Sequence, residues 1–338
     1  MVCIYLATDD GVVVLRPGNG MWRPEVQLSS QAWCLAADPG RPGRLYCGTF
    51  GSGLWRSDDA GTTWHEAGAG LPYAEVMSVA VSAVEQGADG GVVWAGTEPS
   101  ALFRSEDGGR HWQELPALRR VPSAPTWSFP PRPWTSHVRW IAPDPNEAER
   151  IFVGIELGGV MRSLDGGLSW EDRKPGSQHD CHTLATHALA PGRVYETAGG
   201  GYAETLDGGT TWHGDDAGLQ HHYLWGLAVD PADPDAIVIS AARGPRQAHD
   251  ASAAEAFIYR RVRGTAWQRV NAGLPVPRGN RTYVLASHVA EPGVFFAAND
   301  RGIYRSPDAG RSWEQQSVSW PQGYTPAAVH AILLADDA

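Results

Sequence analysis

The amino-acid sequence predicts an all-β fold, a seven-bladed β-propeller closed by pairing of its N- and C-terminal strands. Three observations predict it: a recurring turn motif that ends in Trp, short apolar strands on either side of that motif, and a composition rich in turn formers. The 338 residues include 40 Gly, 25 Pro and 15 Trp, and 19% are charged. This composition is typical of many short strands joined by turns, with little helix.

The turn motif places Ser or Thr, Asp, Gly and Trp at constant offsets. Its five copies are SDDAGTTW (57–64), SEDGGRHW (105–112), SLDGGLSW (163–170), TLDGGTTW (205–212) and SPDAGRSW (306–313). We expect the Asp to accept hydrogen bonds from turn amides and the Gly to take a positive φ. The Trp is expected to fill the gap beside the hairpin.

These copies resemble the Asp-box, or bacterial neuraminidase repeat. That repeat occurs in β-propellers that resemble sialidases, xyloglucanases, sortilin-type receptors and a photosystem assembly factor. The resemblance covers nearly the whole chain and implies the propeller fold. It implies no single function, because members of this superfamily do unrelated things.

Counting one Trp for each repeat predicts seven blades in a single domain. These positions are Trp22, Trp64, Trp112, Trp170, Trp212, Trp267 and Trp313. Blade 1 is expected to combine residues 1–28 with 327–337, a lone first strand whose pairing would close the ring and hide its edges. The other predicted blades span 29–72, 73–117, 135–176, 177–219, 220–275 and 279–319, with loop insertions at 115–136 and 243–256.

Charge, apolar runs and cysteine usage argue against several classes of protein. The net charge of −11 repels phosphate backbones, so no nucleic-acid partner is expected. No signal-peptide pattern is recognisable at the start, and no apolar run approaches about 18 residues. We therefore expect no membrane span and a cytoplasmic location. The four cysteines form no CxxC pair and are expected to be reduced.

Aligning the first strands of the blades predicts a ring of polar side chains at the mouth of the central channel. The aligned position reads Gln31, Glu75, His137, Asp180, Tyr223, Arg281 and His330. His179 and His222 precede this position by one residue, and Arg139 and His182 follow it by two. Loops between second and third strands add Glu98 and Glu156, which concentrates carboxylates and imidazoles in blades 3 to 5. The alternative is that these groups are only solvated.

The stretch QHDCH (178–182) concentrates metal-binding residue types within this ring. Strand alternation places Asp180 and His182 on one face and His179 and Cys181 on the other. Chelation by all four is therefore excluded, and any metal held here must be shared with blades 3 and 4.

Our first hypothesis is a metal-dependent enzyme, of hydrolase or lyase type, that acts on a small molecule. Mixed His and carboxylate ligands suit Zn, Mn, Fe or Ni, and an open coordination position would activate water or polarise a substrate oxygen. The candidate metal ligands are His137, His179, His182, His222 and His330, with Glu156 as a further ligand. The candidate catalytic residues are Glu98, Glu156, Asp180 and Arg281.

The two insertions offer substrate contacts. Trp127 and Trp134 in 115–136 could form a lid or a platform for stacking sugars, and Arg243 lies in 243–256. With Glu75 and Tyr223 these complete the predicted substrate-binding set. The alternative is that the aromatic side chains pack the loop onto the body of the domain.

Two other functions remain open. A glycoside hydrolase would use carboxylates such as Glu98 and Glu156 as acid and base or nucleophile on a glycan. A typical sialidase is not expected, because the Phe/Tyr-Arg-Ile-Pro stretch of that family is absent. A non-catalytic binding or assembly protein, with a protein partner, would instead present a broad apolar or single-sign face.

Overall fold

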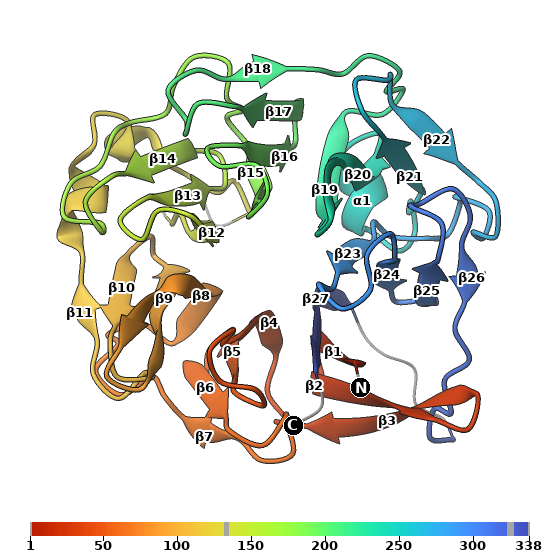
Figure 1. Cartoon of the computed structure of the whole chain (residues 1–338), viewed down its shortest axis with the longest axis horizontal. Coiled ribbons are helices and arrows are strands. Elements are labelled where there is room, and N and C mark those ends of the chain that lie inside the picture. Colours follow the sequence, from red (N-terminus) through yellow and green to blue (C-terminus); the bar gives the residue numbers. More distant parts are fainter. Residues whose placement is uncertain (1, 132–134, 323–327, 337–338) are drawn as a thin grey trace.

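The computed structural model describes residues 2–131, 135–322 and 328–336. Within these ranges, seven antiparallel sheets stand as blades around a central channel, which confirms the predicted seven-bladed β-propeller (Figure 1). Each blade begins with its first strand at the channel and ends with its last strand at the rim. The first strands therefore position whatever side chains meet at the centre.

Blade 1 closes the ring by joining the two ends of the chain. Its sheet has the order β27 (Val329–Asp336), β1 (Val2–Thr8), β2 (Gly11–Gly18) and β3 (Met21–Gln27). The antiparallel ladder from Val2–Asp336 to Thr8–Val329 joins strands more than 300 residues apart in sequence (Figure 1). The edge that each terminal strand would otherwise expose is thereby paired.

The other six blades are each continuous in sequence. Blades 2 to 4 consist of β4 (Ala32–Ala37), β5 (Leu45–Thr49), β6 (Leu54–Ser57) and β7 (His65–Glu66); β8 (Glu75–Gly87), β9 (Gly90–Glu98), β10 (Leu102–Ser105) and β11 (Gln113–Glu114); and β12 (Val138–Pro143), β13 (Ile151–Ile155) and β14 (Gly159–Ser163). In blade 4 an isolated bridge between Arg162 and Glu171 takes the place of a fourth strand.

Blades 5 to 7 follow the same plan. They consist of β15 (Cys181–Thr186), β16 (Val194–Ala198), β17 (Gly201–Thr205) and β18 (His213–Gly214); β19 (Tyr223–Asp230), β20 (Asp233–Ala242), β21 (Ala256–Arg261) and β22 (Gln268–Val270); and β23 (Val284–Ser287), β24 (Phe295–Asn299), β25 (Gly302–Ser306) and β26 (Glu314–Gln315). The second strands are buried on both faces because each lies between two neighbouring blades.

Within the described ranges, helix is confined to three short segments. These are α1 (Pro245–His249), η1 (Pro116–Arg120) and η2 (Ala124–Thr126), which lie in the two insertions. Among the described residues, no helix has the length and apolar character needed to cross a bilayer.

The five turn motifs share one hydrogen-bond pattern, seen clearly in blade 4. Ser163 Oγ donates to Asp165 Oδ1 at 2.8 Å and accepts from the amide of Gly167 at 2.8 Å. The same Asp165 oxygen accepts from the amide of Ser169 at 2.8 Å, and Gly167 has a positive φ of 89°. The equivalent bonds recur in the other four copies.

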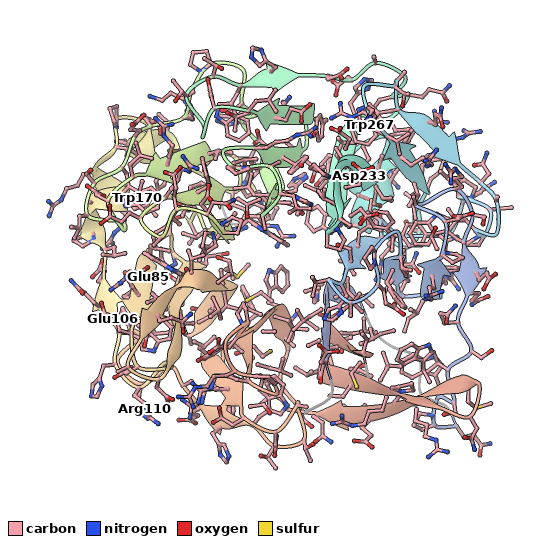
Figure 2. All side chains as sticks on the ribbon, in the orientation of Figure 1. Glu85, Glu106, Arg110, Trp170, Asp233 and Trp267 are labelled. Atoms are coloured by element: carbon pink, nitrogen blue, oxygen red, sulfur yellow. The ribbon has the colours of Figure 1, made fainter. Side chains whose placement is uncertain are left out.

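The repeat Trp residues anchor the outer part of the blades, both in the turn motifs and in blade 6, which has no copy of the motif. Trp170 donates from Nε1 to the carbonyl of Gly167 in its own turn at 3.0 Å, whereas Trp267 donates to the carbonyl of Asp215 in the preceding blade at 2.8 Å. Figure 2 shows both side chains away from the centre of the ring. The motifs therefore stabilise the rim and leave the centre to other residues.

Replacing Ser163 by Ala is expected to lower the free energy of unfolding by about 1–2 kcal/mol. The side chain is buried, so its loss leaves the amide of Gly167 without a partner and removes one acceptor bond from Asp165. Urea denaturation of wild type and variant measures the difference. An unchanged midpoint would contradict this role for the turn hydroxyl.

The cysteines are free thiols, as the sequence predicts. Cys181 is fully buried between blades 4 and 5, where a Cβ on Gly154 would lie only 2.5 Å from its Sγ. Only glycine at position 154 allows this close packing. Cys181 is therefore a packing residue, and its chain neighbours Asp180 and His182 face the channel mouth.

Candidate functional site

The same irregularity occurs in the first strand of six blades. In each of these strands a β-bulge adds one residue at an equivalent position near the channel mouth. A bulge re-aims the extra side chain out of the normal alternation. We call the re-aimed residues the bulge ring; its members, in blade order, are His330, Trp33, Met77, Arg139, His182 and Trp225.

Aromatic and cationic members of the bulge ring contact one another. The guanidinium of Arg139, from blade 4, lies over the ring of Trp225, from blade 6, at 4.5 Å. The imidazole of His182, from blade 5, lies 4.8 Å from the rings of both Trp225 and Tyr223. These contacts fix the positions of one cation and one imidazole at the channel mouth.

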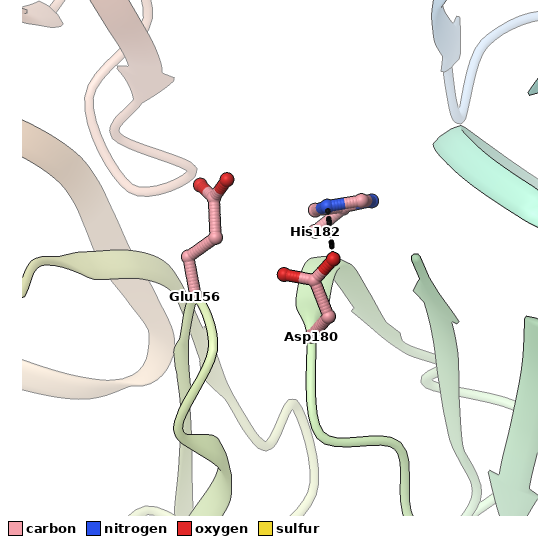
Figure 3. Close-up of side chains that lie close together, drawn as sticks. All are labelled: Glu156, Asp180 and His182. Atoms are coloured by element: carbon pink, nitrogen blue, oxygen red, sulfur yellow. Dashed lines mark ion pairs between the residues drawn. The ribbon is translucent and has the colours of Figure 1, made fainter. Parts of the chain in front are cut away.

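Glu156, Asp180 and His182 form a compact group that we call the ligand cluster. One potential ligand atom from each lies within 4.8 Å of the others, and Figure 3 shows the three side chains converging from two blades. Glu156 follows β13 of blade 4, and Asp180 directly precedes β15 of blade 5. The closest contact joins His182 Nε2 and Asp180 Oδ2 at 3.4 Å.

The tautomer of His182 follows from its backbone contact. Nδ1 lies 2.6 Å from the carbonyl oxygen of Leu224, which can only accept, so Nδ1 carries the proton. In the neutral ring, Nε2 therefore presents its lone pair to the ligand cluster. This nitrogen is buried and has no hydrogen-bond partner in the described part of the chain, and the same is true of Asp180 Oδ1. Unpaired buried polar atoms are costly unless a ligand meets them.

His137 and Glu98 lie behind Glu156. His137 Nε2 is 2.8 Å from Glu156 Oε2, and its Nδ1 is 3.3 Å from Glu98 Oε2. Thr135 donates to the other oxygen of Glu98 at 3.1 Å. The imidazole is 2% exposed, so its Nε2 hydrogen bond to Glu156 and its longer Nδ1 contact with Glu98 lie in a region with little water. His137 thus orients Glu156 toward the ligand cluster.

Charge interactions in this region favour ionised groups. Burial acts to raise the pKa of Glu156, but the hydrogen bond from His137 and the positive charges around the carboxylate lower it to about 2. Burial acts to lower the pKa of His137, but its bonds to Glu156 and Glu98 outweigh burial and raise it. Glu156 is therefore an anion at neutral pH and available as a metal ligand.

Aromatic residues of the 115–136 insertion cover His137. The ring of Phe129 meets the imidazole edge-on at 4.9 Å. Trp127 packs against the core between blades 3 and 4, and its Nε1 donates to Ser123 Oγ at 3.1 Å. Ser123 is in turn bound to Asp172 of blade 4. Trp134, the other predicted contact in this insertion, lies outside the described residues.

Two residues predicted to contact substrate, Tyr223 and Glu75, lie near the ligand cluster. Tyr223 packs on His182, and its hydroxyl lies 3.1 Å from Nε2 of His249 in α1. Desolvation lowers the pKa of His249 to about 4. Glu75 begins β8 and lies opposite Glu98 in the β8–β9 ladder.

Other predicted site residues lie apart from the ligand cluster. His330 hydrogen-bonds Asp9 at 2.7 Å and stacks on Trp33 at 4.2 Å. Arg281, in blade 7, lies 3.8 Å from Asp300, and Arg243 pairs with Glu255 at 2.8 Å. The remaining two predicted metal ligands, His179 and His222, are exposed.

Sequence reasoning missed Trp33 and Trp225 as members of the site. Both lie within apolar first strands, where a Trp is normally assigned to the core. The bulges that turn them toward the channel have no composition signal in a single sequence. Their position two residues beyond the polar ring, the same as that of Arg139 and His182, is the signal that could have found them.

No protein-family model and no curated protein matches the sequence. Solved structures match in fold. The GH74 xyloglucanase from Xanthomonas campestris has a TM-score of 0.69 at 19% identity over 94% of this chain and 52% of its own. The GH74 enzyme from Niastella koreensis has the same TM-score at 17% identity over 92% of this chain and 52% of its own.

A third solved structure, YCF48 bound to D1 peptide, has a TM-score of 0.58 at 17% identity over 86% of this chain and 84% of its own. At these identities the likeness shows the propeller fold alone. The chain spans about half the length of the two GH74 enzymes. Glycoside hydrolases and a peptide-binding protein thus share this fold.

Proposed function

We propose that the protein is a metal-dependent enzyme, of hydrolase or lyase type, that acts on a small molecule at the channel mouth. One observation carries the proposal: the buried Nε2 of His182, fixed as an acceptor, lies beside the carboxylates of Glu156 and Asp180. A nitrogen and two carboxylate oxygens suit Zn, Mn, Fe or Ni. Three protein ligands leave a coordination position for water or substrate.

The geometry needs only small adjustments to hold such an ion. With metal–ligand bonds of about 2.0–2.2 Å, tetrahedral ligands lie about 3.3 Å apart. His182 Nε2 and Asp180 Oδ2 already lie 3.4 Å apart. The ligand atoms lie within 4.8 Å of one another, so Glu156 must approach by up to about 1.5 Å, within reach of side-chain rotation. The hydrogen bonds of His182 to Leu224 and of Glu156 to His137 are the supporting contacts that metal ligands need.

Metal analysis of protein purified without a His tag tests the proposal. We expect close to one equivalent of a divalent transition metal, which a chelator removes and added Zn²⁺ restores. At free metal 100 times above Kd, binding should stabilise the folded state by about 2.7 kcal/mol, visible as a rise in Tm. Protein that contains no metal and does not retain added Zn²⁺, Mn²⁺, Fe²⁺ or Ni²⁺ would overturn the proposal.

A glycoside hydrolase is the second candidate, favoured by two carboxylates that face one another across the ligand cluster. Retaining enzymes of this type place their carboxyl groups about 5–5.5 Å apart, and oxygens of Glu156 and Asp180 lie within 4.8 Å. Such an enzyme would cleave aryl glycosides in the presence of a chelator and lose activity in Asp180→Asn. A chelator-sensitive activity would instead favour the metal enzyme.

We also propose that the five turns are Asp-box repeats. Their shared pattern of Ser or Thr, Asp and Gly hydrogen bonds supports this assignment. The GH74 fold likeness is in keeping with it. The repeats would then be architectural, because all five lie at the rim, away from the ligand cluster.

A further inference from the structure

A cavity of about 560 Å³ occupies the central channel. We call it the channel cavity. Its wall is formed by the first strands of the blades, with bulge-ring members Trp33, Met77, Arg139, Trp225 and His330 among its lining residues. Apolar side chains such as Leu35, Val79, Ile141, Leu184, Leu227 and Leu285 make up most of the remaining wall. Its volume lies in the range of small-molecule sites, about 300–1,000 Å³.

The hydroxyl groups of this wall are already used. Ser78 Oγ donates to the carbonyl of Val138, and Thr183 Oγ1 to that of Trp225, each at 2.7 Å. Ser287 Oγ donates across to blade 6 in the same way. Because each hydroxyl is paired with the backbone of a neighbouring blade, the wall offers a ligand mainly carbon atoms. The channel cavity therefore favours an apolar body.

Arg139 is the exception in this apolar wall. Its side chain is 6% exposed, and within the described residues it makes one ion pair, at 3.6 Å from Nε to Glu156. Its Nε is buried without a hydrogen-bond partner in the described part of the chain. A guanidinium carries five N–H donors, and leaving one of them buried without a hydrogen bond is costly. No Asp or Glu appears among the described residues that line the channel cavity. An anionic acceptor inside the cavity would satisfy this cation.

We propose that the channel cavity binds one molecule of a small amphipathic carboxylic acid. The carboxylate lies on the guanidinium of Arg139, and the apolar body extends down the channel between the first strands. A planar carboxylate matches the fork of a single guanidinium. A doubly charged phosphate fits less well, because Glu156 and Asp180 lie close by. This inference goes beyond the proposed function and needs no bound metal.

Calorimetric titration of the chelator-treated full chain with hexanoate, octanoate and decanoate tests the inference. We expect saturable binding of one molecule per chain, with Kd falling about fourfold for each added methylene, as burial of a CH₂ predicts. 1-Octanol, which has the same chain without the charge, should bind at least about tenfold more weakly. Absence of saturable octanoate binding, or equal binding of octanol, would overturn the proposal.

Three variants locate the ligand. Arg139→Gln should weaken octanoate binding at least about tenfold, and Leu35→Trp should do the same by filling the channel. The matched control is Leu168→Trp at a residue that is 71% exposed, and it should bind octanoate as wild type does. Octanoate affinity within twofold of wild type in either of the first two variants would contradict the assigned position.

A fourth variant separates this inference from the proposed function. His182→Gln removes a member of the ligand cluster that does not line the channel cavity. It should therefore lose metal and keep octanoate binding. If wild-type protein binds octanoate but no metal, only the proposed function fails; if it binds metal but no octanoate, only this inference fails.

Discussion

Replacing His182 by Gln is expected to weaken binding of Zn²⁺ by at least about 100-fold. Loss of a partner that only supports a metal ligand already costs 10–100-fold in affinity, and His182 supplies the single nitrogen of the ligand cluster. Gln keeps much of the side-chain volume between Tyr223 and Trp225, and its amide can still donate to the carbonyl of Leu224. The neutral amide is a poor ligand for a borderline-soft metal.

His179→Gln is the matched control for this experiment. It makes the same change three residues earlier in the chain, at an exposed imidazole outside the ligand cluster. Its Kd for Zn²⁺, measured by competition with a fluorescent chelator, should equal that of wild type. Near-UV circular dichroism of both variants checks that the aromatic contacts persist. Retention of wild-type affinity by His182→Gln would exclude Nε2 as a ligand.

The fold was predictable because its signals are local. Each turn motif carries its own donors, acceptors and positive-φ glycine within eight residues, as SLDGGLSW shows in blade 4. The pairing of β27 with β1 followed from a lone first strand at the C-terminal end of the sequence. These features need no knowledge of long-range packing, so one sequence was enough to predict seven blades.

The side chains at the centre of the ring were less predictable, because a bulge shifts the alignment of equivalent positions between first strands. His330 was aligned with Gln31, yet it occupies the bulge in β27 that corresponds to Trp33 in β4. A bulge shifts every later position in its strand by one residue, and the local residue pattern gives no sign of where it occurs. Glu156, Asp180 and His182 were predicted as site residues because carboxylates and imidazoles bind metals. Only the folded chain shows that the three side chains converge.

The four histidines predicted near the channel mouth in blades 4 to 6 differ in burial, which the sequence could not show. His137 and His182 are each at most 2% exposed and oriented by partners from the surrounding chain, whereas His179 and His222 are exposed. All four stand within two residues of the same aligned position. Whether a side chain at such a position turns inward depends on the neighbouring blade and on the 115–136 insertion, which covers His137 with Phe129.

Replacing His137 by Leu is expected to lower the free energy of unfolding by about 3–5 kcal/mol in the presence of a chelator. The change removes the imidazole that lies between Glu156 and Glu98 and leaves two buried carboxylates facing an apolar side chain. Removing one partner of a buried ion pair has this cost because the other charge stays buried and unpaired. Guanidinium denaturation at neutral pH measures the change.

A double-mutant cycle distinguishes loss of the ion pair from simple loss of packing. Glu156→Gln removes the charge that His137 compensates, so in the His137→Leu background it should cost less than in wild type, or restore stability. The coupling is expected because Nε2 and Oε2 lie 2.8 Å apart in a region with little water. Additive effects would mean that His137 acts as a packing residue and does not orient Glu156.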